Sequence, residues 1–466
     1  MKNLMIAALV IGATSISFAQ GNESTVNQTG TNQAALVGQI GSQNKSYVDQ
    51  VDNDNFTWVS QNGNKNVSDV DQAGAFNYGE VFQSGTMNSA MINQDGLLNE
   101  AYQEQYGYNN LAKSTQEGFG NFSDQYQDGR NNEAIVGQNY NSSFINTAYQ
   151  EQYGNGNWAH IFQGDEFNEA YQTQFGNKNH ADIYQNLSSY SGENYASQFQ
   201  SGNRNYALIH QGGDGDYAEN NYAEQYQLGG NDNEAYSFQK SFDNESYQTQ
   251  MNGNENVAKV NQDDASWLFA SNNNLALQVQ DGNRNRATVN QNANSYSNEA
   301  YQFQVGNDNR VEATQSGASN VSVQEQDGNL NESDVNQGQT LALLTANNSS
   351  HSVQEGNRNK TTVNQDGISN LSGIYQLGNR NNAVIDQDGL SNVSGVAQLG
   401  NRNGAWITQD GTLNISGVAQ FGNNNKVYSL QNGMGNVSGT IQVGANHVNT
   451  VHQVGNGNTA GVIQSN

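Results

Sequence analysis

Glutamine has the most regular spacing in this chain, and its side-chain amide both donates and accepts hydrogen bonds. Toward the C-terminus one glutamine follows another every eleven residues, at Gln354, Gln365, Gln376, Gln387, Gln398, Gln409, Gln420, Gln431, Gln442, Gln453 and Gln464. A second such series runs from Gln28 to Gln138. Glutamines that lie above one another in stacked strands, ~4.8 Å apart, can form an amide ladder. The first chemistry that the sequence predicts is therefore structural hydrogen bonding.

Asparagine and glycine keep the same period. Asparagine stands five residues after glutamine, and the candidate ladder positions are Asn359, Asn370, Asn381, Asn392, Asn403 and Asn414. Glycine usually stands two residues after glutamine, and the candidate turn positions are Gly356, Gly367, Gly378, Gly389, Gly400 and Gly411. Glycine suits a turn because it adopts positive φ angles freely. The asparagine amides are expected to stack in a ladder like that of the glutamines.

Residue types that usually carry catalysis or bind metals show no such pattern. The six histidines form no metal-binding motif, cysteine is absent, and no glycine-rich loop ends in Lys-Ser or Lys-Thr. The calcium-binding repeat Gly-Gly-x-Gly-x-Asp is also absent. We therefore expect no catalytic residue, no cofactor and no metal site, and we predict that the protein is not an enzyme.

Two rows of charged residues recur at intervals of 22. One row is Asp366, Asp388 and Asp410, and the other is Arg358, Arg380 and Arg402. The aspartates could bind cations or pair with a neighbouring rod. The favoured interpretation is that exposed charges near turns keep the edges soluble.

The elements that must position these rows are short strands. From asparagine through a small residue and Val or Ile to glutamine, the periodic positions alternate with the others, as on the inward face of a strand. The residue after glutamine alternates between Asp366 in one half-coil and Leu377 in the next, so a full coil has about 22 residues. We predict an all-β fold, a cross-β-like β-solenoid of stacked two-strand coils that forms one continuous rod. With about 19 coils at ~4.8 Å each, the rod would be about 90 Å long.

The composition agrees with continuous strand pairing. Apolar residues make up 34% and charged residues 13%, which is too little for an ordinary core and leaves disorder as the alternative. The chain has no proline, a residue that cannot donate to a strand ladder and that disordered linkers usually contain. The net charge of −27 disfavours nucleic acid and anionic membranes as partners.

The chain divides into four regions. Residues 1–19 have the charge pattern and short apolar stretch of a signal peptide, which predicts export. Residues 20–138 and 354–466 form regular arrays. Between them, residues 139–353 keep the repeat but contain insertions, which we expect to form loops at turns. No further segment is apolar enough for a transmembrane helix, so no membrane insertion is expected.

The central region also carries a tyrosine-containing variant of the repeat. The sequence Asn-Glu-Ala-Tyr-Gln occurs at 99–103, 168–172 and 298–302. We expect its tyrosines to point outward and its glutamines to replace the inward Val or Ile. Tyr149 and Tyr171 are 22 residues apart and are expected to stack on adjacent coils.

The repeat resembles the curlin repeat, Ser-x5-Gln-x-Gly-x-x-Asn-x-Ala-x3-Gln. In this chain one copy consists of Ser372, Gln376, Gly378, Asn381, Ala383 and Gln387. The resemblance implies a secreted bacterial subunit, outside the cell or on its surface, that polymerises into fimbrium-like curli amyloid fibres for adhesion and biofilm matrix. It also implies end-to-end self-association, a nucleator subunit and an outer-membrane secretion pore. This chain is much longer than the common five-repeat subunit.

Other functions remain open from the residues alone. A monomeric adhesin could bind a surface or a carbohydrate through its tyrosine-rich face and its loops. A carbohydrate-cleaving β-helix would need a carboxylate cluster in a cleft, and an ice-binding protein would need rows of Thr-x-Thr; the sequence has neither. Solution mass distinguishes the fibre subunit from the adhesin.

Overall fold

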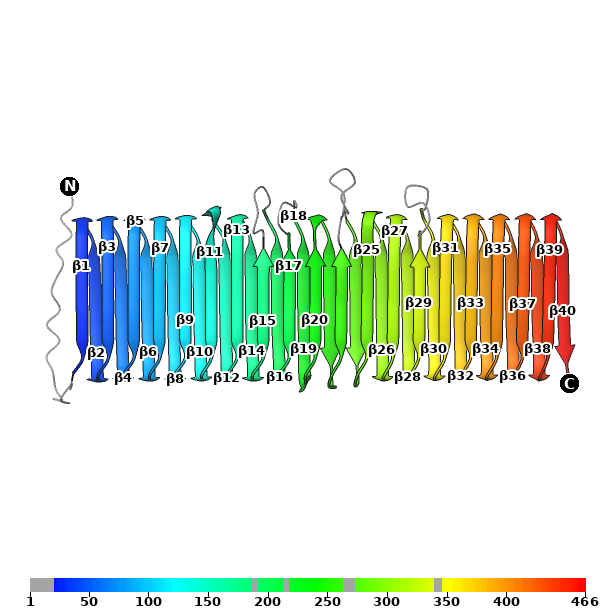
Figure 1. The fold of residues 1–466 in the computed structure, drawn as a ribbon, viewed down its shortest axis with the longest axis horizontal. Coiled ribbons are helices and arrows are strands. Elements are labelled where there is room, and N and C mark those ends of the chain that lie inside the picture. The colour runs from blue at the N-terminus through cyan, green and yellow to red at the C-terminus, as the bar shows by residue number, and fades with distance from the viewer. Residues whose placement is uncertain (1–20, 186–191, 213–217, 263–272, 339–345) are drawn as a thin grey trace, which may run out of the picture.

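The protein is a flattened rod of stacked coils with one strand on each broad side (Figure 1). The computed structural model describes residues 21–185, 192–212, 218–262, 273–338 and 346–466, and within these ranges it contains strands and turns but no helix. The predicted all-β solenoid is thus confirmed. The predicted signal peptide, residues 1–19, lies outside the described residues.

One broad side is a parallel sheet of 19 strands, here called sheet A. Its strands, in the order in which they stack, are β1 (Glu23–Thr31), β3 (Lys45–Asn53), β5 (Val67–Ala75), β7 (Ser89–Leu97), β9 (Leu111–Phe119), β11 (Glu133–Phe144), β13 (Trp158–Glu166), β15 (His180–Gln185), β17 (Tyr206–Gln211), β20 (Glu234–Gln239), β23 (Val257–Gln262), β25 (Arg286–Tyr296), β27 (Arg310–Ala318), β29 (Glu332–Gln337), β31 (Lys360–Ile368), β33 (Asn382–Leu390), β35 (Gly404–Thr412), β37 (Lys426–Met434) and β39 (Val448–Asn456).

The opposite side is sheet B, which is also parallel. Its strands, in stacking order, are β2 (Ala34–Ser42), β4 (Phe56–Asn64), β6 (Tyr78–Thr86), β8 (Glu100–Tyr108), β10 (Phe122–Arg130), β12 (Thr147–Asn155), β14 (Glu169–Asn177), β16 (Tyr195–Asn203), β19 (Tyr222–Asn231), β22 (Glu245–Met251), β24 (Leu275–Asp281), β26 (Glu299–Asn307), β28 (Val321–Asn329), β30 (Ser349–Asn357), β32 (Leu371–Asn379), β34 (Val393–Asn401), β36 (Ile415–Asn423), β38 (Val437–Ala445) and β40 (Thr459–Ser465). A separate short pair joins β18 (Ala218–Glu219) to β21 (Ser241–Phe242).

The register of both sheets places identical repeat positions above one another. In sheet B, Gln376 of β32 lies opposite Gln398 of β34, and Gly378 lies opposite Gly400. In sheet A, Gln365 of β31 lies opposite Gln387 of β33. Because partners in these regular coils are 22 residues apart, the period-22 pattern of the sequence becomes straight rows of like residues along the rod.

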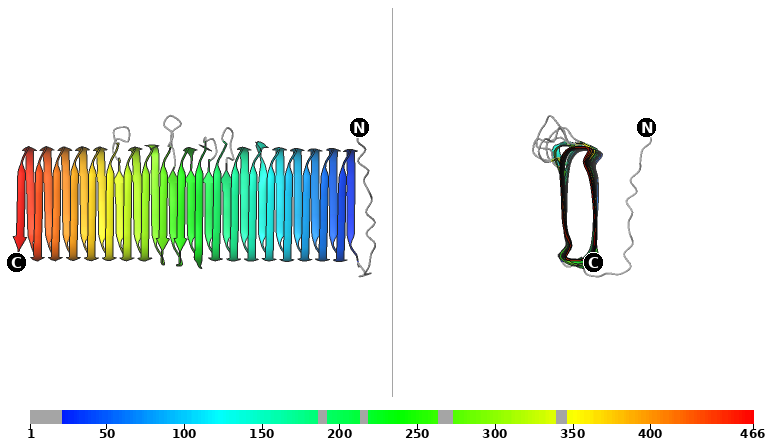
Figure 2. Two further views of the ribbon diagram at one scale, coloured as in Figure 1. Left: turned by 180° about the vertical axis from the view of Figure 1, so that it is seen from behind. Right: turned by 90° about the vertical axis from the view of Figure 1, so that its right-hand side faces the viewer.

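The interior is thin and mostly polar. The end-on view shows two nearly flat walls facing each other across a narrow space (Figure 2). Apolar residues fill mainly two inward rows, for example Ala383 and Ile385 on β33, both fully buried. Buried amides flank these rows: Asn381 and Gln387 are at most 1% exposed. The apolar contribution per coil is therefore small, and hydrogen bonding must satisfy the rest of the interior.

The large insertions of the central region all connect a strand of sheet A to the next strand of sheet B. They follow β15, β17, β23 and β29, and the segments 186–191, 213–217, 263–272 and 339–345 lie outside the described residues. The strands on either side keep their register: Gln185 lies opposite Gln211, although the two are 26 residues apart.

Candidate functional site: amide ladders and outer faces

The predicted ladder glutamines point into the rod and form two continuous chains of hydrogen bonds. In sheet B, Nε2 of each glutamine from Gln354 to Gln442 donates to Oε1 of the glutamine one coil further on, with N···O distances of 2.7–3.0 Å. In sheet A, the chain from Gln365 to Gln453 has distances of 2.8–2.9 Å. Every bond has the same direction, so each ladder carries a donor at its C-terminal end.

Each ladder glutamine also joins the two sheets. Nε2 of Gln376 on β32 donates to the backbone oxygen of Lys360, the first residue of β31 on the opposite wall, at 3.0 Å. The equivalent bond from Gln398 reaches the oxygen of Asn382 at 3.1 Å. One side chain therefore holds its coil to the next coil and holds the two walls together.

The asparagine rows differ from the amide-to-amide ladder expected from the sequence. Oδ1 of Asn359 accepts the backbone N–H of Asn381 at 3.0 Å, while Nδ2 of Asn359 donates to the oxygen of Gly378 at 2.9 Å. The same pattern holds at Asn370, Asn381, Asn392, Asn403 and Asn414. An amide-to-amide bond is added at a few positions, such as Asn414 to Asn392 at 3.1 Å. The row stacks as expected, but the asparagine side chain mainly satisfies the backbone of the turn.

The predicted turn glycines are not in the turns themselves: each is the second-last residue of a strand, directly before the turn, at a position where only glycine fits. Gly356, Gly367, Gly378, Gly389, Gly400 and Gly411 have φ angles between 105° and 126°. A Cβ at Gly378 would lie 2.0 Å from the oxygen of Gly400 in the next coil. The glycine row thus allows the turns to stack as closely as the strands do.

A second left-handed position escaped the sequence reasoning. The residue directly before each ladder asparagine also has a positive φ, for example 59° at Arg358 and 54° at Ser391. Its type varies widely along the rod, from Arg, Ser, Asn, Asp and Lys to Leu, Phe and Met, so composition gives little signal. Each such residue carries a modest backbone strain, which the asparagine hydrogen bonds hold in place.

The outer face of sheet B carries an aromatic ladder longer than the predicted Tyr149–Tyr171 pair. These two rings stack with centroids 5.1 Å apart. The ladder crosses nine strands with centroid separations of 4.6–5.6 Å, through Phe56, Tyr78, Tyr102, Phe122, Tyr149, Tyr171, Tyr195, Tyr222 and Tyr247. Burial against neighbouring rings and the adjacent Glu100 raise the pKa of Tyr102 to about 12. The row of rings extends along the outer face of sheet B from β4 to β22.

The glutamines of the tyrosine-containing variant form an extra ladder inside the rod. Nε2 of Gln103 donates to Oε1 of Gln125 at 2.8 Å, and Nε2 of Gln302 donates to Oε1 of Gln324 at 2.9 Å. Gln172 is likewise buried and bonded to Gln198. In these coils a buried amide takes the place of an apolar side chain.

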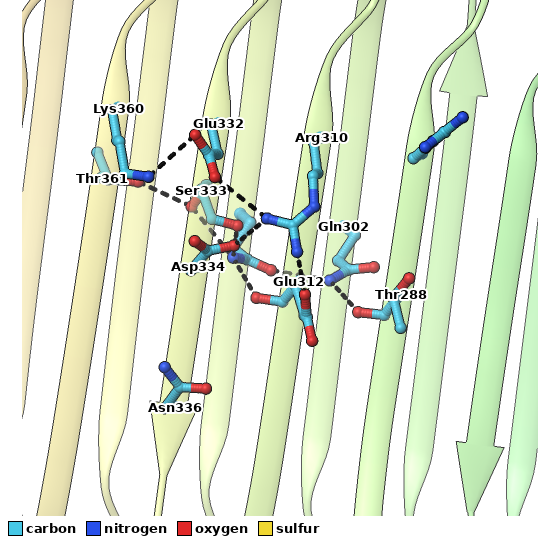
Figure 3. A network of polar contacts seen from close by, with 12 residues as sticks. Thr288, Gln302, Arg310, Glu312, Glu332, Ser333, Asp334, Asn336, Lys360 and Thr361 are labelled. Carbon is cyan, nitrogen blue, oxygen red and sulfur yellow. Dashed lines mark hydrogen bonds and ion pairs between the residues drawn. The ribbon is translucent and has the colours of Figure 1, made fainter.

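Ion pairs between strands occur on the outer face of sheet A (Figure 3). Arg310 contacts Glu312, and its Nη1 lies 2.8 Å from Asp334 Oδ1 and 3.2 Å from Glu332 Oε1. Lys360 Nζ lies 3.0 Å from the other oxygen of Glu332. This network ties β27, β29 and β31 together across one of the insertions.

The two predicted charge rows are present as stacks. Asp388 lies opposite both Asp366 and Asp410 in sheet A, and burial together with these two carboxylates raises its pKa. Arg358, Arg380 and Arg402 line a groove at the turns that follow sheet B. Among the described residues, no group of three or more His, Cys, Asp or Glu side chains is placed to hold a metal ion.

One buried carboxylate lies on the outer face of sheet A. Asp182 is 6% exposed and lies 2.9 Å from His180 Nε2 and 3.6 Å from His160 Nδ1. Burial lowers the pKa of His160 to about 4, so its imidazole is neutral at pH 7. The stacked Trp158 and His180 rings pack over this group. Oδ2 of Asp182 lies close to His180 and to the hydroxyl of Tyr206, whereas Oδ1 accepts no hydrogen bond from any of the described residues.

Fold and ladders together define a class of protein, an all-β solenoid whose coils are held by stacked amide side chains. The model of one family, the curlin associated repeat, matches residues 69–96, 356–389 and 400–428. Three segments of the chain thus match the curlin associated repeat, and the resemblance seen in the sequence is confirmed at this level. A comparison with curated proteins gives no match.

The matched family is structural rather than enzymatic. Within the part of the chain that the structure describes, no helix has both the length and the apolar character needed to cross a membrane. The candidate functional features of the described chain are the buried amide ladders and the side chains on the two outer faces.

Proposed function

We propose that this protein is a secreted subunit that assembles end to end into extracellular curli-like amyloid fibres. The observation that carries the proposal is the geometry of the two rod ends. Among the described residues, β1 and β2 pair only with β3 and β4, while β39 and β40 pair only with β37 and β38. Each end thus offers two strand edges with the same repeat pattern.

The hydrogen-bonding groups of the two ends are complementary. At the C-terminal end, Gln442 donates to Gln464, whose own Nε2 would be the donor for a further coil. At the N-terminal end, Gln39 donates to Gln61, which leaves Oε1 of Gln39 as the acceptor for a preceding coil. A second copy placed in register would continue both ladders without a change of direction.

The proposal extends to export and partners. The signal peptide expected at residues 1–19 supports secretion, and the curlin repeat supports a location outside a bacterial cell or on its surface. We propose an outer-membrane pore and a nucleator subunit as partners, and adhesion and biofilm matrix as the roles of the fibre.

Assembly of purified residues 20–466 tests the proposal. After dilution from denaturant, thioflavin T fluorescence should rise, and fibres should give a reflection at ~4.7–4.8 Å along their axis. Gln464→Lys places a cation at the end of a ladder and should slow elongation at least about tenfold. Ser465→Lys, one residue further on and pointing outward, is the matched control and should elongate normally. A chain that stays monomeric for days at high concentration contradicts the proposal.

A monomeric adhesin is the second candidate, and the aromatic ladder of sheet B favours it. Such a rod would bind its surface or carbohydrate through this face while its ends stay unpaired. A stable β-rich monomer in the same assay, with binding lost when Tyr149 and Tyr171 are replaced by serine, would support the adhesin.

A further inference from the structure

The last five coils carry a row of glycines that the chain itself does not need. These glycines stand three residues before a ladder glutamine and are the third residues of β32, β34, β36, β38 and β40: Gly373, Gly395, Gly417, Gly439 and Gly461. None of them has a positive φ, and a Cβ built on any of them would meet nothing within 4 Å. Glycine weakens the interior of a strand, and such a glycine often marks a place where another surface approaches closely.

These glycines form the floor of an apolar groove on the outer face of sheet B. The groove has a volume of about 950 Å³ and runs from His351 on β30 to Ile463 on β40. Exposed branched side chains flank it, on one side Leu371, Val393, Ile415 and Val437. On sheet A the equivalent row is filled by Thr362, Val384, Trp406, Tyr428 and Thr450. The groove is therefore a property of one face rather than of the repeat.

Beyond His351, which lines the groove at its β30 end, the strands that carry the glycines have no charged side chain. The five strands read LSGIYQLGN, VSGVAQLGN, ISGVAQFGN, VSGTIQVGA and TAGVIQS, with no Asp, Glu, Lys, Arg or His. The whole chain has a net charge of −27. Two copies repel each other over most of their surfaces, and this face is where close approach costs least.

We infer that the glycine groove is a side-to-side docking surface for a second copy of this chain. Five strands at ~4.8 Å and seven residues at ~3.3 Å give a face of about 24 Å by 23 Å. Two such faces bury roughly 1,100 Å² in total, which exceeds the ~1,000 Å² expected of a specific interface. A second copy also has the same axial repeat as the groove, so its side chains match the glycine row over the full length. This contact is separate from the rod ends and goes beyond end-to-end assembly.

The test uses Gly417→Glu, which places a charge in the groove where the backbone and the surrounding space tolerate a side chain. The matched control is Thr450→Glu, an exposed residue at the same repeat position on sheet A. Sedimentation equilibrium of freshly diluted chain should show a dimer for the wild type. Gly417→Glu should raise its dissociation constant at least about 30-fold, and Thr450→Glu should change it less than threefold.

Electron microscopy separates this contact from fibre growth. Wild-type and Thr450→Glu fibres should contain laterally paired filaments, whereas Gly417→Glu should give single filaments that elongate at the wild-type rate. If no fibres form, end-to-end assembly fails, and sedimentation still decides the side-to-side contact. Wild-type chain that stays unpaired in both assays overturns the inference. Pairing that persists in Gly417→Glu also overturns the inference. Binding of an apolar dye in the groove of unpaired copies would overturn it as well.

Discussion

At the scale of single residues, three side-chain types perform three different tasks. The ladder glutamine links coil to coil and wall to wall, the asparagine satisfies the backbone of the turn, and the turn glycine permits close stacking. Since the interior is narrow, a wrong residue at any of these positions has nowhere to relax. Substitutions in these inward rows should therefore lower the stability of the fold much more than substitutions at the neighbouring outward positions.

Gly378→Ala tests the turn row. The new Cβ would collide with the oxygen of Gly400, 2.0 Å away, at a φ of 120°. We expect a loss of at least about 2 kcal/mol in the free energy of unfolding, measured by guanidinium denaturation followed by circular dichroism. The control Gly395→Ala has extended backbone and open space, so it should change the free energy by less than about 1 kcal/mol. Equal effects would mean that the clash is relieved elsewhere.

Gln376→Ala tests the ladder row. The variant removes the donor to Gln398 and to Lys360 and leaves Oε1 of Gln398 without its amide donor. We expect destabilisation by about 2–4 kcal/mol, because a buried polar group loses its partner and a cavity forms. The control is Leu377→Ala, the adjacent outward residue, 39% exposed, which should cost less than about 1 kcal/mol. Similar denaturation midpoints for the two variants would contradict the role of the ladder.

At the scale of the strand, outward rows bring like residues together whether or not they attract. Stacked aromatic rings gain contact along the rod, whereas stacked carboxylates repel and are partly desolvated. Asp124 on β10 lies between Tyr102 and Tyr149. Its burial, and to a smaller extent the nearby carboxylates of Glu104 and Glu151, raise its pKa to about 6. Such a residue destabilises the fold at neutral pH.

Asp124→Asn tests this effect through pH dependence. The folded-state pKa lies above the ordinary value of 3.8, so the folded protein binds the proton more readily and its stability rises as pH falls from 7 toward 4. Asp124→Asn should stabilise the protein at pH 7 by about 1 kcal/mol after allowance for solvent screening. At pH 4 the difference from the wild type should shrink, in guanidinium titrations at both values. A constant difference would show that Asp124 does not titrate in this range.

At the scale of the whole molecule, the rod behaves as a one-dimensional stack. Each coil contacts mainly the coils before and after it, so stability is approximately a sum of neighbouring interfaces. The central insertions agree with this view, because β15 and β17 keep their register across extra residues. The rod should therefore tolerate deletions or insertions of whole coils, because these keep the repeat positions of neighbouring coils aligned.

Deletion of whole coils tests this property. Removal of residues 382–403, one full coil of 22 residues, joins Asn381 to Gly404 and preserves every row. We expect a folded rod about 4.8 Å shorter by small-angle scattering, with a nearly unchanged denaturation midpoint. Removal of residues 388–403 deletes fewer residues but joins Gln387 directly to the next strand without a turn. This shorter deletion should lower the midpoint clearly, and equal tolerance of both would contradict the phase argument.

The sequence alone determined the period, the all-β class and the residues that face inward, but it did not show that the strands extend past the glycines and leave only two residues for each turn of the regular coils. This was possible because a coil of two strands repeats every 22 residues, so residues separated by 22 positions in the sequence lie above one another in the rod. Gln376, Gly378 and Asn381 are recognisable for this reason, and so is the predicted stacking of Tyr149 on Tyr171.

Only the tertiary structure decided how each row bonds and what the outer faces offer. Asparagine amides bind mainly backbone groups and only at some positions one another, because the left-handed residue before each asparagine turns the chain and leaves those groups unpaired. The glycine row from Gly373 to Gly461 is visible in the sequence, yet its meaning depends on the empty space around each Cβ position. The spacing of residues in the sequence determines which residues lie above one another. Hydrogen-bond partners and grooves depend on the backbone conformation and on distances between atoms, which the spacing does not contain.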